Sequence, residues 1–190
     1  MDLKQKVTTS TQMRGAMVFE FFSPGIPIIL KNAGCEFIIF DMEHGGISLE
    51  QFKTLSIISN ANKIAPFLRI PEINYNYIAR ALDLGALGIM VPMVNTPDDA
   101  IKIVQSSKYP PKGKRGAGFG FVHDNYINQN PLSYIEKANN SLINIIQIET
   151  KIALENVKEI ASINGVDCIW VGHFDLTNFL GIPGDFSSTI

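Results

Sequence analysis

The sequence predicts an α/β fold built on a parallel sheet. Apolar runs alternate with helix-like segments about six times along 190 residues, which is the pattern of strand–helix units joined by right-handed crossovers. Four apolar runs end abruptly in side chains able to do chemistry, and in parallel folds such strand ends share one face. Two architectures stay open: a doubly wound sheet, or an incomplete (β/α)8 barrel, since closed barrels typically need about 250 residues.

Composition and charge are those of a globular protein. The chain is 46% hydrophobic and 18% charged, with a net charge of −2 and a pI near 5.9, so nothing favours binding to nucleic acid or an anionic membrane. The polar start lacks the apolar core of a signal peptide. We expect one domain over residues 1–190 in a cytoplasmic protein, with Cys35 and Cys168 reduced and packed rather than paired.

Turn residues separate the first predicted elements. After a polar lead-in at 1–12 that forms one short helix, strands are expected at 16–22, 36–40, 65–70 and 88–91. Ser23 is the candidate cap of a helix at 27–32, and Gly34 ends that helix.

The next helices have clearer start signals. Ser48 and Gln51 match a capping box, and apolar spacing continues this helix to about residue 61. A helix at 75–84 ends at Gly85. Thr96, followed by a proline and two aspartates, begins a helix that should run to about residue 107.

Residues 109–120 interrupt this rhythm, because no regular element fits their prolines, glycines and basic residues. Long irregular loops inside compact domains tend to be functional. Beyond the loop we expect a helix at 130–139, a strand at 144–148, a helix at 153–161 and a strand at 165–172. The tail from residue 180 is rich in turn residues and has no predicted element.

Four strand ends carry the candidate chemistry. They present Asp41, Glu43 and His44, then Arg69, then Gln147 and Glu149, then His173 and Asp175. Glu149 and Asp175 are separated by one strand-to-strand repeat, and two carboxylates suit Mg2+ or Mn2+, which act as Lewis acids on an enolate. The alternative for this pair is an ion pair or a helix cap.

The other polar groups also have two interpretations each. His44, which follows Asp41 and Glu43, is either a general base oriented by a carboxylate or a histidine hydrogen-bonded within a tight loop. Arg69 either holds an oxyanion or forms a structural ion pair. No lysine stands at the four polar strand ends, so a Schiff base is not expected there.

Seven short motifs occur in order between about residues 15 and 184. They are Asp-Met-Glu-His-Gly, Leu-Arg-Ile-Pro, Leu-Asp-Leu-Gly-Ala, Val-Pro-Met-Val-Asn-Thr, Tyr-Pro-Pro-Lys-Gly-Lys-Arg-Gly, Gln-Ile-Glu-Thr and Val-Gly-His-Phe-Asp-Leu. With them the sequence resembles the HpcH/HpaI family of class II, metal-dependent pyruvate aldolases. The resemblance implies a (β/α)8 TIM barrel, of which this chain carries about six of eight units. It also implies reversible cleavage of 4-hydroxy-2-oxo acids to pyruvate and an aldehyde.

The resemblance also implies roles for single residues. Glu149 and Asp175 look like the ligands of a divalent cation, Mg2+, Mn2+ or Co2+. Arg69 looks like the arginine that binds the keto oxygen and stabilises the pyruvate enolate. His44 looks like the acid–base histidine, with Asp41 in the same loop.

Further roles concern assembly and the substrate. Asp83 resembles an aspartate that pairs with the histidine across a subunit interface, in a homo-oligomer that is usually hexameric in the family. Gln147 looks like a contact to the 2-oxo acid substrate, as do Gly172, His173 and Phe174. The last two depart from the proline and small residue common in the family, and their bulk is expected to alter the pocket.

The resemblance leaves a structural gap and two competing functions. Family members continue for a further helix and two more strand–helix units, so the first and sixth strands are expected to have exposed edges. One alternative function is an acyl-CoA lyase of the citrate lyase β type, with only the basic residues of 112–115 to meet coenzyme A. The other is a truncated, non-catalytic barrel that serves as an interaction module or is a non-functional fragment.

Overall fold

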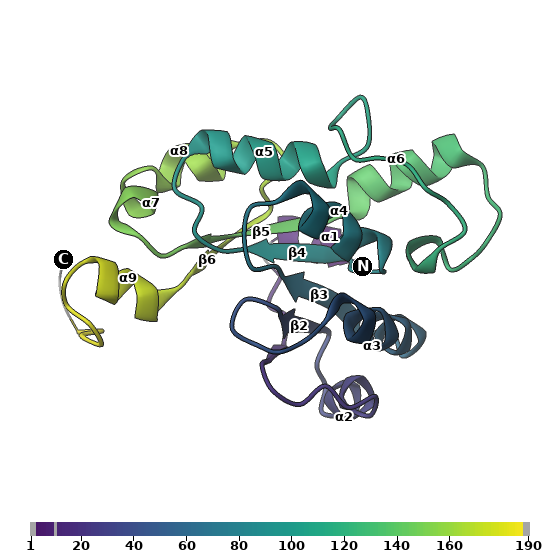
Figure 1. The fold of residues 1–190 in the computed structure, drawn as a ribbon, viewed down its shortest axis with the longest axis horizontal. Helices are drawn as coiled ribbons and strands as arrows, with labels where there is room; N and C mark the ends of the chain where they lie inside the picture. The colour runs from purple at the N-terminus through teal and green to yellow at the C-terminus, as the bar shows by residue number, and fades with distance from the viewer. Residues whose placement is uncertain (1–2, 10, 188–190) are drawn as a thin grey trace.

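The computed structural model describes residues 3–9 and 11–187 and contains one curled, open sheet of six parallel strands (Figure 1). The strands are β1 (Gly15–Val18), β2 (Phe37–Asp41), β3 (Ala65–Arg69), β4 (Gly88–Val91), β5 (Ile143–Ile148) and β6 (Cys168–Val171). They lie side by side in chain order, with β1 and β6 at the edges. A doubly wound sheet reverses its strand order, so this order decides for the barrel-type curl. The predicted exposed edges are confirmed.

Helices connect every pair of successive strands, and one further helix lies before β1 and another after β6. They are α1 (Leu3–Thr8), α2 (Ile26–Asn32), α3 (Leu49–Ala61), α4 (Tyr75–Asp83), α5 (Pro97–Ser107), α6 (Pro131–Ser141), α7 (Lys151–Glu155), α8 (Val157–Ser162) and α9 (His173–Phe179), with a 3-10 helix η1 (Val122–Asp124). A capping box starts α3 at Ser48, as predicted, and the predicted cap of α5 at Thr96 is also part of a capping box. Gly34 and Gly85 have positive φ angles of 89° and 98°, as glycines that follow helix ends should.

Side chains alternate between two apolar layers across the sheet. Phe40 and Leu68 belong to the larger cluster, which packs the outer face against the helices. Ile39 and Phe67 belong to a smaller cluster inside the curl, where Leu3 of α1 also packs. The inner face is therefore filled by side chains over most of the strand length, and α1 contributes to that filling.

The helix predicted at 153–161 is wrong as a single element. The structure has two short helices, α7 and α8, which meet at Asn156. The Nδ2 of Asn156 donates a hydrogen bond of 2.9 Å to the carbonyl oxygen of Asn95. This contact with a distant loop ties the backbone down where the helical pattern alone would run on.

Three further predictions at the two edge strands are corrected. Ser23 does not cap α2, because Gly25 occupies the N-cap position and the Ser23 hydroxyl oxygen accepts from the N–H of Gly25, at 3.4 Å, rather than from a helical N–H. The strand predicted at 16–22 ends at Val18, and Phe21 beyond it is exposed, since β1 has a neighbour on one side only. Residues 173–179 form α9, where no helix was predicted.

Both cysteines are free thiols, as expected. Burial raises the pKa of Cys168, and the nearby Asp167 adds to the effect, so this thiol stays protonated and a poor nucleophile. Among the helices of the described residues, none is long and apolar enough to cross a membrane.

Candidate active site

Strand alternation brings four polar side chains to the carboxyl ends of β2, β3 and β5, inside the curl. Asp41 and Arg69 are register partners in β2 and β3. Gln147 ends the inner row of β5, and Glu149 follows two positions later. All four are buried, with Glu149 only 1% exposed. These are the same inner rows that carry the apolar cluster lower in the sheet.

One chain of polar contacts joins these side chains. Arg69 Nε donates to Asp41 Oδ1 at 2.6 Å, and its Nη1 lies 3.4 Å from Gln147 Oε1. Gln147 in turn donates from Nε2 to Glu149 Oε2. The same Nη1 of Arg69 lies 3.1 Å from Glu43 Oε2. Arg69 is therefore the centre of the cluster and links all three strands.

Asp41 fixes the loop that follows β2. Its carboxylate accepts hydrogen bonds of 3.1 Å from the backbone N–H groups of Glu43 and His44. The His44 ring is 61% exposed, and its Nε2 lies 3.8 Å from Glu43 Oε2. The carboxylate beside the ring is thus that of Glu43, whereas Asp41 holds the backbone and Arg69.

The electrostatics of the cluster are unbalanced. Burial would lower the pKa of Arg69, but the hydrogen bond that Arg69 donates to Asp41 and the charges of Asp41, Glu43 and Glu149 raise it. Burial likewise opposes ionisation of Asp41, yet the hydrogen bond and charge of Arg69 outweigh it and lower the pKa. For Glu43 burial prevails and the pKa is raised. One guanidinium faces three carboxyl groups, which leaves excess negative charge.

Two backbone segments hold the Glu149 carboxylate. The N–H of Met93 donates to Oε1 at 2.6 Å, from a residue with a φ of 54° that is unusual for a side chain with a Cβ. Gly172 covers the other side, because a Cβ there would lie 2.6 Å from Oε2 and 2.9 Å from the Glu149 Cβ. Gly172, predicted to contact substrate, is therefore also required for the position of Glu149.

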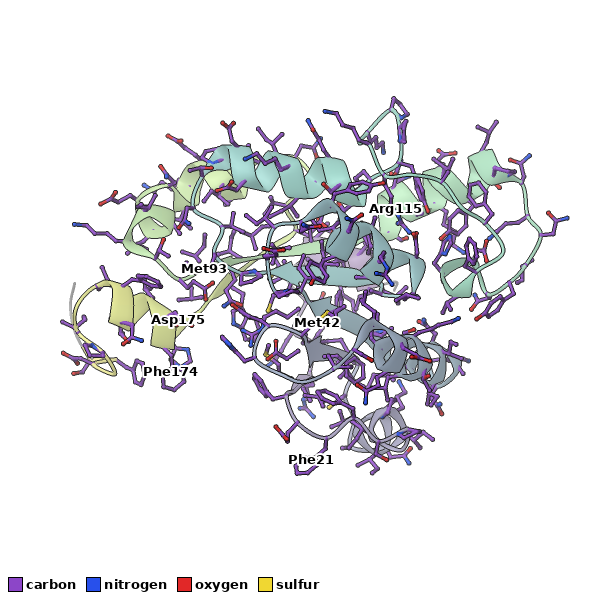
Figure 2. The ribbon with its side chains drawn as sticks, in the orientation of Figure 1. Phe21, Met42, Met93, Arg115, Phe174 and Asp175 are labelled. Atoms are coloured by element: carbon purple, nitrogen blue, oxygen red, sulfur yellow. The ribbon has the colours of Figure 1, made fainter. Side chains whose placement is uncertain are left out.

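The remaining strand-end residues lie on the first turn of α9. The His173 ring packs against Phe174 and Phe186, with centroid distances of 4.5 and 5.0 Å. Asp175 is partly exposed and lies on the same side of the molecule as Met93 (Figure 2). No contact joins Asp175 to Glu149 within the described chain, and no group of three or more His, Cys, Asp or Glu residues there is arranged to hold a metal.

Asp83 lies at the end of α4 and has a partner within the chain that was not predicted from the sequence. Its Oδ1 accepts a hydrogen bond of 2.6 Å from Nη2 of the buried Arg115. Within the part of this chain that is described, no contact joins Asp83 to His44. The pairing of these two residues across subunits stays a prediction.

Comparison with known proteins places this site in a family. The protein-family model described as HpcH/HpaI aldolase/citrate lyase matches residues 21–189 of the sequence. The chain belongs to the HpcH/HpaI family. A solved HpcH/HpaI aldolase from Desulfitobacterium hafniense DCB-2 is 30% identical, with a TM-score of 0.94 over 100% of this chain and 73% of its own.

Two curated relatives of this HpcH/HpaI chain have names that describe a reaction. A hydroxypyruvate/pyruvate aldolase of Deinococcus radiodurans is 36% identical over 80% of this chain and 55% of its own length. A 4-hydroxy-2-oxo-heptane-1,7-dioate aldolase of Shigella boydii is 30% identical over 83% of this chain and 60% of its own. The chain thus spans little more than half the length of these relatives.

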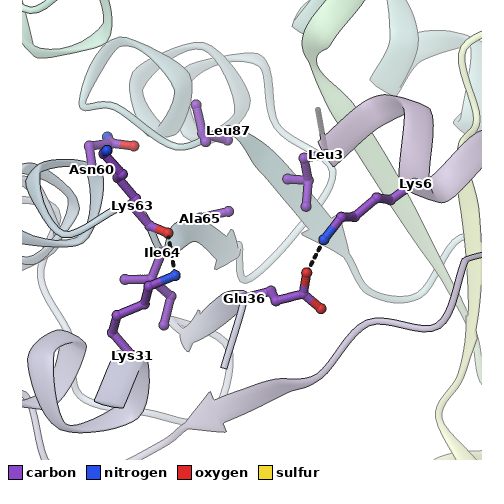
Figure 3. Close-up of a pocket in the computed structure, with 9 residues that line it drawn as sticks. All are labelled: Leu3, Lys6, Lys31, Glu36, Asn60, Lys63, Ile64, Ala65 and Leu87. Atoms are coloured by element: carbon purple, nitrogen blue, oxygen red, sulfur yellow. Dashed lines mark hydrogen bonds and ion pairs between the residues drawn. The ribbon is translucent and has the colours of Figure 1, made fainter. Parts of the chain in front are cut away.

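A pocket of about 370 Å3 lies at the other end of the HpcH/HpaI sheet, near the start of β2 and β3 (Figure 3). Lys6, Lys31 and Lys63 line it; Lys6 pairs with Glu36, and Lys31 Nζ donates to the Lys63 carbonyl oxygen at 3.0 Å. Lys31 lies in the last turn of α2 and Lys63 follows α3, where helix dipoles favour cations. The lysines are therefore explained without a ligand, and no predicted site residue lines this pocket.

Three groups of the HpcH/HpaI site were not assigned from the sequence. Glu43, as a partner of Arg69, continues the inner alternation two positions past Asp41. Phe19, whose ring centroid lies 5.8 Å from Arg69 Cζ, continues it from β1, so periodicity alone could have identified both. The N–H of Met93 has no such signal, because a backbone contact leaves no mark on residue type.

Proposed function

We propose that this chain carries the site of a metal-dependent class II aldolase, on six units of a (β/α)8 barrel. The substrate would be a 4-hydroxy-2-oxo acid, cleaved reversibly to pyruvate and an aldehyde. The observation that carries the proposal is the buried Arg69, held between Asp41, Glu43 and the Gln147–Glu149 pair. A fixed cation at a water-poor strand end is suited to negative charge that develops on a substrate oxygen.

The donor set fits a divalent cation. The cluster has more carboxylates than cations, and Oε2 of Glu43 is buried without a regular hydrogen bond to the described residues. Carboxylate oxygens are the ligands that Mg2+ and Mn2+ prefer, and Co2+ also accepts them. Glu149 and Asp175 would hold the ion. When bound, it supplies Lewis-acid stabilisation of the pyruvate enolate.

The protein groups have separable tasks in cleavage. A base removes the proton of the C4 hydroxyl, C4 becomes the aldehyde carbonyl, and the electrons of the C3–C4 bond pass into the enolate. His44 suits this task because its exposed ring can exchange protons with solvent. Arg69 uses Nε and Nη1 within the site, and no described residue accepts from Nη2, which can donate to the enolate oxygen. Protonation at C3 completes pyruvate.

Substrate contacts and assembly complete the proposal. Gln147 and the turn of Gly172, His173 and Phe174 would contact the 2-oxo acid at the ends of β5 and β6. Asp83 of a neighbouring subunit would face His44 in a homo-oligomer. Such an assembly would make the site depend on subunit contacts as well as on the fold of one chain.

Proton exchange at the pyruvate methyl group tests the proposal. In D2O with Mg2+ or Mn2+, NMR should show deuterium entering the methyl group, and a chelator should stop it. Glu149→Gln is expected to abolish exchange, whereas Glu155→Gln, an exposed carboxylate of α7, should leave it unchanged. A folded protein that shows no metal-dependent exchange would contradict the proposal and favour a non-catalytic module.

A second candidate follows from the citrate lyase branch in the family description. An acyl-CoA lyase would use the same enolate chemistry on a thioester. It requires a coenzyme A site, so calorimetric titration with coenzyme A separates the two enzymes. Binding would favour the lyase, and its absence together with pyruvate exchange would favour the aldolase.

A further inference from the structure

Glu43 is a partly buried acid of the site for which the proposed cleavage steps have no task. Its Oε2 lies 3.1 Å from Nη1 of Arg69 and 3.8 Å from Nε2 of His44. That oxygen is shielded from solvent and makes no hydrogen bond of regular geometry to the described residues. Buried polar atoms left in this way are uncommon and ask for a physical explanation.

The charged groups that face Glu43 come from three parts of the sheet. Arg69 ends β3, Glu149 follows β5, and Asp41 and His44 flank Glu43 after β2. Burial raises the pKa of the Glu43 carboxyl; Arg69 and His44 oppose this, while Glu149 and Asp41 add to it. Arg69 and His44 are therefore the two neighbours that favour the carboxylate form of Glu43, against burial and the two nearby acids.

Arg69 holds Glu43 less firmly than it holds Asp41. Its hydrogen bond to Asp41 is 2.6 Å long and has regular geometry. Its contact with Glu43 is 3.1 Å long and lacks the geometry of a hydrogen bond. An anionic substrate that engages the guanidinium would therefore replace Glu43 first. The displaced negative charge would then act mainly on the His44 ring, its other basic neighbour.

We propose that Glu43 is a positioning residue shared by Arg69 and His44, and that substrate binding at Arg69 shifts its charge toward His44. The proposal deepens the proposed function and rests on it, because the substrate-bound state is that of the aldolase site. A stronger interaction with Glu43 increases the proton affinity of His44. The ring thus becomes a better base when the C4 hydroxyl proton has to leave.

NMR of labelled histidine rings, without any ligand, tests whether Glu43 interacts with His44. The chain has three histidines, and His123→Gln and His173→Gln assign the signals. At a fixed pH near 6.5, the ratio of protonated to neutral His44 should fall about threefold in Glu43→Gln, because a unit charge close to the ring is lost. Glu50→Gln, an exposed acid in the first turn of α3, should not change the ratio.

Removal of the Arg69 guanidinium tests whether Arg69 competes with His44 for the charge of Glu43. Arg69→Gln should raise the ratio about threefold, and Arg69→Gln combined with Glu43→Gln should return it to the level of Glu43→Gln alone. Pyruvate with Mg2+ should raise the ratio in the natural chain and not in Glu43→Gln. Should Arg69→Gln fail to fold, the pyruvate experiment decides.

The outcomes separate this inference from the proposed function. An unchanged ratio in Glu43→Gln would overturn the inference, as would a rise in Arg69→Gln that persists when Glu43 is also replaced. A pyruvate-induced rise that persists in Glu43→Gln would overturn it too. A ratio that follows both substitutions but does not respond to pyruvate would support the charge sharing and overturn the substrate-driven shift, and the pyruvate methyl exchange experiment then tells whether the aldolase function fails with it.

Discussion

Asp41 stabilises the fold and the site at once, because one carboxylate serves Arg69 and two backbone N–H groups. Asp41→Asn keeps the shape but removes the charge beside a buried guanidinium. Loss of one partner of such a pair is expected to lower the free energy of unfolding by about 3 kcal/mol near pH 7. Urea unfolding of both proteins measures this difference.

The pH dependence of that difference follows from the lowered pKa of Asp41. The folded state favours the ionised carboxyl, so its contribution is present above the ordinary value of 3.8 and is lost as the pH falls through the lower folded value. The natural chain and Asp41→Asn should therefore converge in stability in strong acid. Asp98→Asn, an exposed acid of α5, is the control. An undiminished difference at low pH would mean that shape, rather than charge, is what Asp41 contributes.

Gly172 sets the position of Glu149. In Gly172→Ala, the added Cβ would meet both the carboxylate and the Cβ of Glu149, so the side chain has to shift. A displacement approaching 1 Å is expected to lower metal-dependent pyruvate exchange about a hundredfold. In Gly25→Ala the nearest atoms are 3.9 and 4.0 Å away, so this variant should exchange as the natural chain does. Equal rates for the two variants would show that Glu149 does not need its observed position.

At the scale of elements, helix starts determine much of the local stability. Thr96 Oγ1 accepts from the N–H of Asp99 at 3.2 Å, and Asp99 Oδ2 accepts from the N–H of Thr96 at 3.1 Å. Thr96→Ala should lower the free energy of unfolding by about 1 kcal/mol, because it leaves a helix N–H without its acceptor. Thr54→Ala, at an exposed position inside α3, removes no cap, and the higher helix propensity of alanine should leave the free energy of unfolding unchanged or raise it by up to about 0.7 kcal/mol. A loss in Thr54→Ala as large as that in Thr96→Ala would show that the effect does not come from the cap.

The same elements show what the sequence could predict. Thr96 with Pro97, and Ser48 with Gln51, marked helix starts correctly, because a cap is a contact between residues three positions apart. The break at Asn156 was missed because its cause is a contact with Asn95, more than fifty residues away. α9 was missed for the opposite reason: no side chain caps it at Gly172, so no local signal exists.

In the candidate site, too, contacts that depend on local sequence were predicted better than contacts between distant segments. Period-two alternation was enough to bring Arg69 and Glu149 to one face, because that geometry is local to each strand. The partner of Asp83 within the chain depends on how separate segments pack, and the sequence left open whether Asp41 or Glu43 is the carboxylate beside His44. The sequence therefore identified which residues meet at the strand ends better than it identified which atoms touch.

At the scale of the whole molecule, the assembled cluster needs only part of the sheet. Asp41, Arg69 and Gln147 come from β2, β3 and β5, and β4 supplies the segment that holds Glu149. None of these strands is at an edge. The strands that carry Asp41, Arg69 and Gln147 therefore each have a neighbouring strand on both sides. Asp175, in contrast, depends on the edge strand β6 and on α9, the helix that follows it.

The open edges lead to a prediction about self-association. Within the described residues β6 pairs only with β5, and its last residue, Val171, is 52% exposed. A free strand edge accepts strands of other molecules, and a lysine on the edge opposes this by placing a charge in the new contact. Val171→Lys should therefore reduce the concentration-dependent growth in mass seen by light scattering. Leu154→Lys adds the same charge on α7, away from the edge, and should have little effect. If both lysines act equally, net charge controls association; if neither does, the exposed side chains around Phe121 and Tyr126 become the surface to test next.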